Sequence, residues 1–280
     1  MSTKQEFEKV FNLIPLISKF HNTNTNLYNA FDKIIVEYIN SIKNEVLEVH
    51  PFENLKWPKI SLGNLDSYNY FSMGEMIIYN YYWNNRDRYN IVFDVGGHIG
   101  IDTIILDKFG YEVYSFEPDP QIFEIMESNV KLNNCKNTHL YSKGMSDKAA
   151  ILEFVRVKGN TTSSHILGER EFYGEVDKFQ IETMTFEDVG VTPDLMKINI
   201  EGHEKTLVPS IPKHIWNKCD VFIELHGLDC CEVIFEYFNE IGINIFSQKI
   251  AWNKVHSIEE LPLSYKEGLI FVSSKDSMNW

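Results

Sequence analysis

A glycine-rich turn between two acids is the stretch of this 280-residue chain best suited to chemistry. Apolar residues 91–93 lead into Asp94, and Gly96, Gly97 and Gly100 follow before a helical pattern begins. This order predicts a buried strand, a tight turn and a helix. Glycines let the backbone approach a ligand closely, and open α/β sheets bind cofactors at the carboxyl ends of their strands. We therefore expect a cofactor site here, although a plain strand–turn–helix would show the same pattern.

The acids around the turn indicate which cofactor would fit. A second apolar run, residues 111–116, ends in Glu117, and an acid there can accept hydrogen bonds from ribose hydroxyls. The dinucleotide fingerprint G-x-G-x-x-G is broken, and a phosphate-binding G-x-x-x-x-G-K-[ST] is absent. Asp102, in the first helical turn, would repel a pyrophosphate. A cofactor with cationic groups and no phosphate suits such a loop, and S-adenosylmethionine has an ammonium and a sulfonium.

A second polar group follows two later apolar runs, residues 194–200 and 221–225. Its members are Asn199, Glu201, Glu224 and His226. Glu224 and His226 are two residues apart, so in a regular strand they face the same side of the sheet. Transfer of a methyl group to a hydroxyl needs a proton acceptor, and a histidine titrates near neutral pH. We therefore predict that His226 is the general base and that Glu224 orients it.

Other interpretations of this group stay open. His226 could be a hydrogen-bonded structural residue, and His203 or His165 could be the base instead. The four residues could also hold Mg²⁺, which prefers oxygen ligands. Only two clear carboxylates would contribute, however, so we assign no metal site from the sequence.

Composition limits the possible partners and location. The net charge of −14 argues against nucleic-acid binding, which needs a basic surface. No apolar run is long enough to span a membrane, and the acidic amino terminus does not resemble a signal peptide. The four cysteines fit neither a zinc site nor a disulfide framework, so we expect reduced thiols in a cytoplasmic protein.

The amino-terminal part reads as helical. Apolar residues recur at spacings of three and four over residues 1–50, and Pro15 divides the first segment. Residues 51–66 contain prolines and a glycine and indicate a loop. We therefore expect a helical extension, residues 1–65, before the main domain, residues 66–280. The extension could cap the main domain, line the substrate entrance or form a homodimer contact.

The rest of the chain alternates between strands and helices, as in a doubly wound α/β sheet. Helix starts are predicted at Ser72 with Glu75, at Asp119 before Pro120, and at Asp229 with Glu232. A strand over residues 138–142 precedes a loop with Gly144 and Asp147 that could hold an adenine ring. Two more strands are predicted over residues 151–157 and 178–184, and the long polar loop between them, residues 159–174, is of a kind that is often functional.

Four of these blocks, in this order, resemble the FkbM-type S-adenosylmethionine-dependent methyltransferases of the class I fold. The family's D-V-G-A-N-I-G-x-x-[ST] is present from Asp94 to Thr103, and its F-E-P-x-P is present at residues 116–120. Its D-L-I-K-I-D-V-E-G-x-E matches residues 194–204, and its E-x-H matches residues 224–226. The resemblance spans about residues 70–275 and implies a mostly parallel, seven-stranded Rossmann-like sheet. The predicted cofactor contacts are Asp94, Gly96, Gly97, His98, Gly100, Thr103, Glu117, Pro118, Gly144 and Asp147.

Two departures from the family pattern bear on function. His98 replaces the usual Asn of the glycine loop, and Asn199 replaces the usual Asp after the fourth core strand. The leading hypothesis is an O-methyltransferase that acts on a hydroxyl of a small molecule or a sugar. The alternatives are a protein of this fold that binds the cofactor, or a partner, without methylating, and a nicotinamide dehydrogenase, which the broken fingerprint disfavours.

Overall fold

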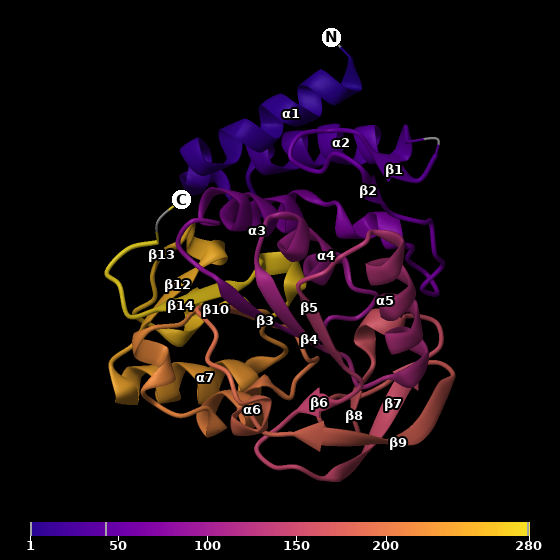
Figure 1. The fold of residues 1–280 in the computed structure, drawn as a ribbon. Helices are drawn as coiled ribbons and strands as arrows, with labels where there is room; N and C mark the ends of the chain where they lie inside the picture. The colour runs from indigo at the N-terminus through magenta and orange to yellow at the C-terminus, as the bar shows by residue number, and fades with distance from the viewer. Residues whose placement is uncertain (1, 43, 279) are drawn as a thin grey trace.

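The computed structural model of the chain, which describes residues 2–42, 44–278 and 280, is built around an eight-stranded sheet (Figure 1). The strand order is β13-β12-β14-β11-β10-β3-β4-β5. Five neighbouring strands are parallel: β3 (Ile91–Val95), β4 (Glu112–Phe116), β5 (Thr138–Tyr141), β10 (Leu195–Ile198) and β11 (Asp220–Ile223). Antiparallel pairs join β14 (Ile270–Ser273) to β11 and to β12 (Asn244–Ser247), and β13 (Asn253–Lys254) to β12. The predicted mostly parallel sheet is confirmed, and the two-residue β13 is added to the seven strands expected.

Helices cover both faces of this sheet. One face packs against α3 (Met73–Asn84), α4 (Ile101–Lys108) and α5 (Pro120–Leu132), and the other against α6 (Glu204–Ser210) and α7 (Leu228–Ile241). Successive side chains of a strand point to opposite faces. Val92 of β3 therefore lies in the hydrophobic cluster under α3, α4 and α5, and Phe93 lies in the cluster under α6 and α7. Strands buried on both sides are therefore apolar almost throughout, and a charged residue within one stands out.

Two of the three predicted helix starts are confirmed. The Ser72 hydroxyl accepts a hydrogen bond from the Glu75 backbone N–H, and the Asp119 carboxylate caps α5 ahead of Pro120. The start predicted at Asp229 is wrong, because α7 begins at Leu228 after Gly227, which caps it without a side chain. Asp229 instead forms an ion pair with Lys205.

A second, four-stranded sheet lies outside the central one, at the end of the molecule opposite the amino-terminal helices (Figure 1). It consists of β6 (Gly144–Met145), β9 (Val176–Met184), β7 (Ile151–Val157) and β8 (His165–Ile166), in this spatial order. The two strands predicted here are therefore present, but they pair with each other and do not widen the central sheet. Short 3₁₀ helices complete the chain: η1 (Ile14–Phe20), η2 (Ser67–Tyr70), η3 (Thr161–Ser163), η4 (Glu187–Val189), η5 (Ile215–Asn217), η6 (Gln248–Ile250), η7 (Ile258–Glu260) and η8 (Tyr265–Glu267).

The amino-terminal extension covers the α3 side of the main domain. Its helices α1 (Thr3–Leu13) and α2 (Asn26–Asn40) are separated by η1, which contains Pro15, as predicted. Helix does not continue to residue 50, because β1 (Val46–Leu47) and β2 (Leu55–Lys56) form a small antiparallel pair. The extension shares one hydrophobic cluster with α3, and the Asn80 side chain on α3 donates to the Phe11 carbonyl at 2.8 Å. It therefore caps the main domain, whereas a homodimer contact stays a prediction.

No helix in the described part of the chain is long and apolar enough to cross a membrane.

Candidate active site

A cavity opens at the carboxyl ends of β3, β4 and β10, below the glycine turn. Six of the residues predicted to contact the cofactor line it: Gly96, Gly97, His98, Glu117, Pro118 and Gly144. Gly96 has φ +90°, and a Cβ there would lie 1.9 Å from the Asn199 carbonyl oxygen. Glycine is required at this position because the turn touches the neighbouring strand, as well as to leave room for a ligand.

The other four predicted contacts lie outside the cavity lining. Asp94 is fully buried, and its carboxylate accepts hydrogen bonds from the Thr103 hydroxyl at 2.6 Å and the Ser115 hydroxyl at 3.4 Å. Gly100 is the N-cap of α4, and the Asp147 carboxylate accepts from the Ser146 hydroxyl. The Asp94–Thr103 bond lies behind the cavity and ties β3 to the helix that follows the turn.

Lys197 on β10, a largely covered lysine, forms ion pairs with Asp94 and Asp102 of the turn region. Its Nζ lies 2.9 Å from an Asp102 oxygen and 4.0 Å from an Asp94 oxygen. Burial raises the pKa of Asp94 to about 6, although Lys197 opposes this shift. Because Lys197 balances the Asp102 charge, Asp102 repels a pyrophosphate less than the sequence argument assumed. A lysine within a buried strand is the sequence signal that we did not use.

Glu117 lies where the sequence argument places the ribose acceptor. Its carboxylate accepts hydrogen bonds from the backbone N–H groups of His98, at 3.0 Å, and Asp119, at 2.8 Å. Burial raises the pKa of Glu117 to about 8, and the nearby Asp119 charge adds to this. Glu117 therefore fixes the backbone of the turn while it faces the cavity.

His98 is held from two sides. Its backbone lies at φ +47°, and its ring Nδ1 is 2.7 Å from the hydroxyl of Tyr70, a residue of η2 that sequence reasoning missed. Its buried Nε2 has no hydrogen-bond partner among the described residues. The glycine cradle, the Glu117 carboxylate and this open nitrogen fit a nucleoside cofactor with an amino-acid group.

A second cavity of about 750 Å³ adjoins the first, and Tyr70, Thr162, Asn199 and Glu201 line both. Its size is in the range of small-molecule sites. Seven of its lining residues are acids: Asp66, Glu75, Glu169, Glu171, Glu201, Glu224 and Asp229. Tyr265 and Leu263, both exposed, also line it. A molecule in this cavity would therefore lie next to a ligand bound in the first cavity.

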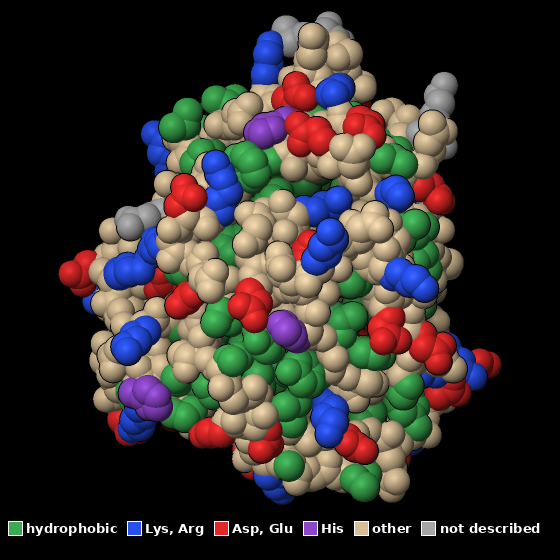
Figure 2. All heavy atoms as spheres, in the orientation of Figure 1, with side chains coloured by type: hydrophobic (Ala, Val, Ile, Leu, Met, Phe, Trp, Pro, Cys, Tyr) green, Lys and Arg blue, Asp and Glu red, His purple; other side chains and the backbone are tan. Residues whose placement is uncertain are grey.

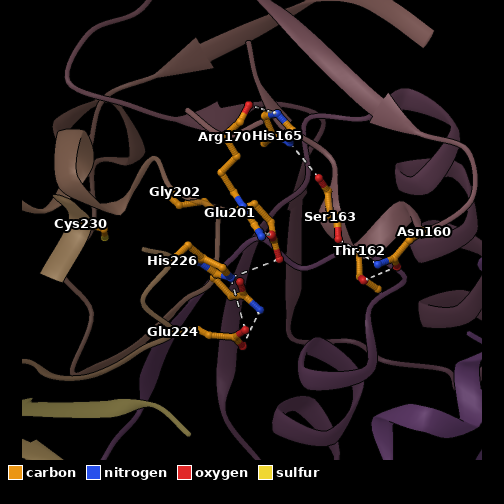
Figure 3. Close-up of polar contacts among 12 residues, drawn as sticks. Asn160, Thr162, Ser163, His165, Arg170, Glu201, Gly202, Glu224, His226 and Cys230 are labelled. Atoms are coloured by element: carbon orange, nitrogen blue, oxygen red, sulfur yellow. Dashed lines mark hydrogen bonds and ion pairs between the residues drawn. The ribbon is translucent and has the colours of Figure 1, made fainter. Parts of the chain in front are cut away.

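The four predicted catalytic residues come together on the wall of the second cavity. The Asn199 amide donates to a Glu224 oxygen at 3.0 Å, and His226 Nε2 lies 3.3 Å from the other Glu224 oxygen. Glu201 approaches the same nitrogen to 3.4 Å and forms an ion pair with Arg170, which reaches in from the polar loop (Figure 3). The side chains of Glu224 and His226 therefore face the same side, as the two-residue spacing predicts.

The charge of His226 differs from what a general base needs. Burial alone would lower the pKa of His226, but hydrogen bonds and charges from Glu204 and Glu224 outweigh it and raise the pKa to about 10. The imidazole is then protonated at neutral pH and cannot accept a proton there. This argues against the predicted role of His226 as the base and favours a cationic residue that holds the carboxylates in place.

The two alternative histidines are held by the protein. His203 lies between Glu169, at 2.6 Å, and the Ser146 hydroxyl, at 2.8 Å. Both ring nitrogens of His165 face backbone carbonyl oxygens. These contacts indicate structural roles.

Three of the four predicted catalytic residues also have the donor types of a metal site. Glu201, Glu224 and His226 offer ligand atoms within 4.8 Å of one another. The guanidinium of Arg170 already neutralises Glu201, so a cation would compete with it.

Comparison with known proteins adds the family. A family model described as the methyltransferase FkbM domain matches residues 94–250, more than half of the chain. The chain belongs to this family. It is therefore an S-adenosylmethionine-dependent methyltransferase. No curated protein sequence matched the chain.

Solved structures similar to this methyltransferase include three from bacteria. SMU.1697c from Streptococcus mutans, in complex with SAH, has 11% identity and a TM-score of 0.42 over 71% of this chain and 96% of that one. The ribosomal protein L11 methylase from Lactobacillus delbrueckii subsp. bulgaricus has 16% identity and a TM-score of 0.40, over 69% of this chain and 75% of that one. The precorrin-6y C5,15-methyltransferase from Geobacter metallireducens GS-15 has 12% identity and a TM-score of 0.39, over 61% of this chain and 73% of that one. These similarities do not indicate the acceptor of this methyltransferase.

Proposed function

We propose that this methyltransferase transfers the methyl group to a hydroxyl of a small polyhydroxylated acceptor such as a sugar. The observation that carries the proposal is the second cavity, which meets the cofactor cavity at Tyr70 and Asn199. Carboxylate, amide and hydroxyl side chains make up most of its lining, and these groups bind hydroxyls by hydrogen bonds. The exposed ring of Tyr265 offers a face on which a sugar could pack.

Positioning is the main task of the protein in this reaction. S-adenosylmethionine, when bound, supplies an activated methyl on a sulfonium, so the acceptor oxygen needs alignment, and alignment can lower the barrier by several kcal/mol. Asn199 suits this role: its Nδ2 is fixed on Glu224, and its buried Oδ1 has no partner among the described residues. That oxygen can accept a hydrogen bond from the acceptor hydroxyl, so the usual Asp is not needed for this contact.

A carboxylate of the second cavity is the better proton acceptor. Glu75, on α3, lines the cavity and makes no ion pair or hydrogen bond through its carboxylate with any described residue. Burial raises the pKa of Glu75 to about 8, and the nearby charge of Asp102 adds to this. General bases work best when their pKa lies near the working pH. We assign proton removal to Glu75, with Glu224 as the second carboxylate, and we assign His226 to holding Glu224 and Glu201.

The charge of the cavity limits the acceptor class. Seven acids line this cavity with one arginine and one histidine, and three of the acids pair with Lys59 or Lys205, which lie outside the lining. The remaining excess of acids disfavours phosphorylated and nucleic-acid acceptors. On the face shown in Figure 2, acidic and basic side chains are interspersed, which does not suit a polyanion. We therefore propose an uncharged or cationic acceptor.

Mass spectrometry of labelled products tests this function. The enzyme would be incubated with S-adenosylmethionine that carries a trideuterated methyl group and with pools of neutral sugars, amino sugars and small alcohols. We expect one labelled methyl ether in the sugar pools, and its loss in Glu224→Gln. Bound cofactor with no labelled product in any pool would instead favour a cofactor-binding protein without turnover, and label on nitrogen would contradict O-methylation.

A further inference from the structure

The contact between Tyr70 and His98 has a consequence for the cofactor cavity. We propose that Tyr70 is a positioning residue: its hydroxyl donates to His98 Nδ1 and so fixes the ring proton on Nε2, which then donates to the carboxylate of the bound cofactor. The inference concerns cofactor binding and does not depend on the acceptor.

Both side chains are held in place before any ligand binds. Tyr70 ends η2, whose first turn is fixed by a capping box between Asp66 and Asn69, and the Tyr79 hydroxyl donates to the Tyr70 carbonyl at 3.3 Å. The His98 backbone N–H is bound by Glu117 at 3.0 Å. The two rings lie with their centroids 5.9 Å apart and their planes tilted by 38°. Little reorganisation is therefore needed for the ring to meet a ligand.

The direction of the hydrogen bond follows from which protons find acceptors. Burial, with the nearby charge of Lys197, lowers the pKa of His98 to about 4, so the ring is neutral and carries one N–H. The Tyr70 hydroxyl has no other hydrogen-bond acceptor among the described residues. If Nδ1 carried the proton, the phenol would have to accept, and its own proton would be left without an acceptor among the described residues. The Tyr70 hydroxyl therefore donates to Nδ1, and the one ring proton of His98 is on Nε2.

The chemistry of the cavity indicates what Nε2 meets. This nitrogen is buried, has no partner among the described residues, and belongs to a residue that lines the cavity. Lys197 is the only lysine or arginine among the described lining residues, and Asp102 already pairs with it. The one anionic group of S-adenosylmethionine is its carboxylate, which therefore needs a neutral donor among acids such as Glu117 and Glu201. A ring N–H at His98 supplies one.

Calorimetry with a matched pair of ligands tests the proposal. We would titrate S-adenosylmethionine and its decarboxylated analogue, which keeps the ammonium and sulfonium, into the wild type, Tyr70→Phe and His98→Ala. Tyr70→Phe should weaken binding of the complete cofactor about 3- to 10-fold, and His98→Ala about 10- to 100-fold. The decarboxylated analogue should bind all three proteins with similar affinity. Tyr68→Phe, on the same 3₁₀ helix but outside both cavity linings, is the matched control and should bind both ligands like the wild type.

Two results would overturn the proposal. Equal losses for both ligands would show that the pair only supports the turn, and unchanged affinities would show that the carboxylate is bound elsewhere. If either variant is too unstable for calorimetry, ¹⁵N spectra of the His98 ring in the unliganded wild type still decide the first step. We expect the proton on Nε2, and a proton on Nδ1 would contradict it. Because no acceptor is present, failure here leaves the proposed O-methylation untouched.

Discussion

His226 Nδ1 lies 3.3 Å from an oxygen of Glu204, a fully buried carboxylate at the start of α6. The same carboxylate accepts the backbone N–H groups of Ile200, at 2.8 Å, and Gly202, at 2.9 Å. Glu204 thus joins the loop after β10 to the end of β11, and His226 connects this buried acid to the two acids of the second cavity. The charge state of one histidine therefore affects both the stability of this loop and the shape of the site.

The first prediction is that the protein loses stability as His226 loses its proton. The pKa of His226 is raised to about 10 in the folded state, above the unfolded value of about 6.5. The folded state retains this proton at pH values where the unfolded chain has lost it, so the stabilisation is complete below about pH 6.5 and disappears as pH rises through 10. In urea unfolding, we expect the free energy of unfolding to fall more steeply over this window in the wild type than in His226→Gln. Parallel pH profiles would contradict the prediction.

The second prediction concerns Glu75. Its raised pKa destabilises the folded protein, whereas the raised pKa of His226 stabilises it. The pKa of Glu75 is raised to about 8, so the folded state resists the ionisation that the unfolded chain undergoes from about pH 4.5. The resulting penalty on the folded state is absent below pH 4.5 and grows until pH 8. We expect Glu75→Gln to raise the free energy of unfolding by about 1–3 kcal/mol at pH 9 and hardly at pH 4.

The same variant also tests catalysis. If Glu75 removes the proton, methyl transfer in the wild type should rise with pH up to about 8, and Glu75→Gln should lower turnover about 10²–10⁴-fold with cofactor affinity nearly unchanged. A stable Glu75→Gln that turns over like the wild type would assign proton removal to Glu224 or to solvent.

The third prediction is cofactor selectivity. We expect S-adenosylmethionine and its demethylated product to bind, and NAD not to bind. Glu117→Ala should weaken cofactor binding by about 1–3 kcal/mol, the cost of leaving a buried polar group without its hydrogen-bond partner. Glu127→Ala is the matched control, because Glu127 is an exposed residue of α5 outside both cavity linings and should leave the affinity unchanged. In calorimetry, micromolar NAD binding without binding of the methyl donor would refute this prediction.

Sequence reasoning located the site well where a motif is local. The glycine turn directly follows the end of β3, and the pair Glu224 and His226 directly follows the end of β11, so both lie at the edge of the sheet where open α/β folds bind ligands. It was less successful where the outcome depends on long-range packing. Asp94 and Thr103 belong to the motif, but their side chains bond to each other behind the cavity.

Residues that come from distant parts of the chain escaped prediction. Lys197 and Asp102 are 95 residues apart, and their ion pair changes the electrostatics inferred from the turn alone. Tyr70 belongs to no motif and reaches His98 only because η2 folds back over the glycine turn. The raised pKa of His226 likewise needs Glu204, which comes from α6, the helix before β11.

The last prediction distinguishes two reasons for glycine at position 96: its positive φ and the close approach of the turn to the Asn199 backbone. Gly96 and Gly110 both have positive φ, +90° and +98°, so alanine at either position carries a backbone strain of about 1–2 kcal/mol. A Cβ at Gly110 would meet no atom within 4 Å, whereas at Gly96 it would lie 1.9 Å from the Asn199 carbonyl oxygen, a backbone atom that cannot move alone. Gly96→Ala must therefore push β3 and β10 apart, at a further cost of about 1–3 kcal/mol.

Thermal unfolding and calorimetry on the two variants test this difference. We expect Gly96→Ala to lower the free energy of unfolding by roughly twice as much as Gly110→Ala, and to abolish binding of S-adenosylhomocysteine because the turn and Asn199 move together. Gly110→Ala should bind it like the wild type, since residue 110 lies at the far end of α4. Equal destabilisation of the two variants would mean that only φ matters at Gly96. Normal binding by Gly96→Ala would mean that the cofactor does not depend on the close approach of this turn to Asn199.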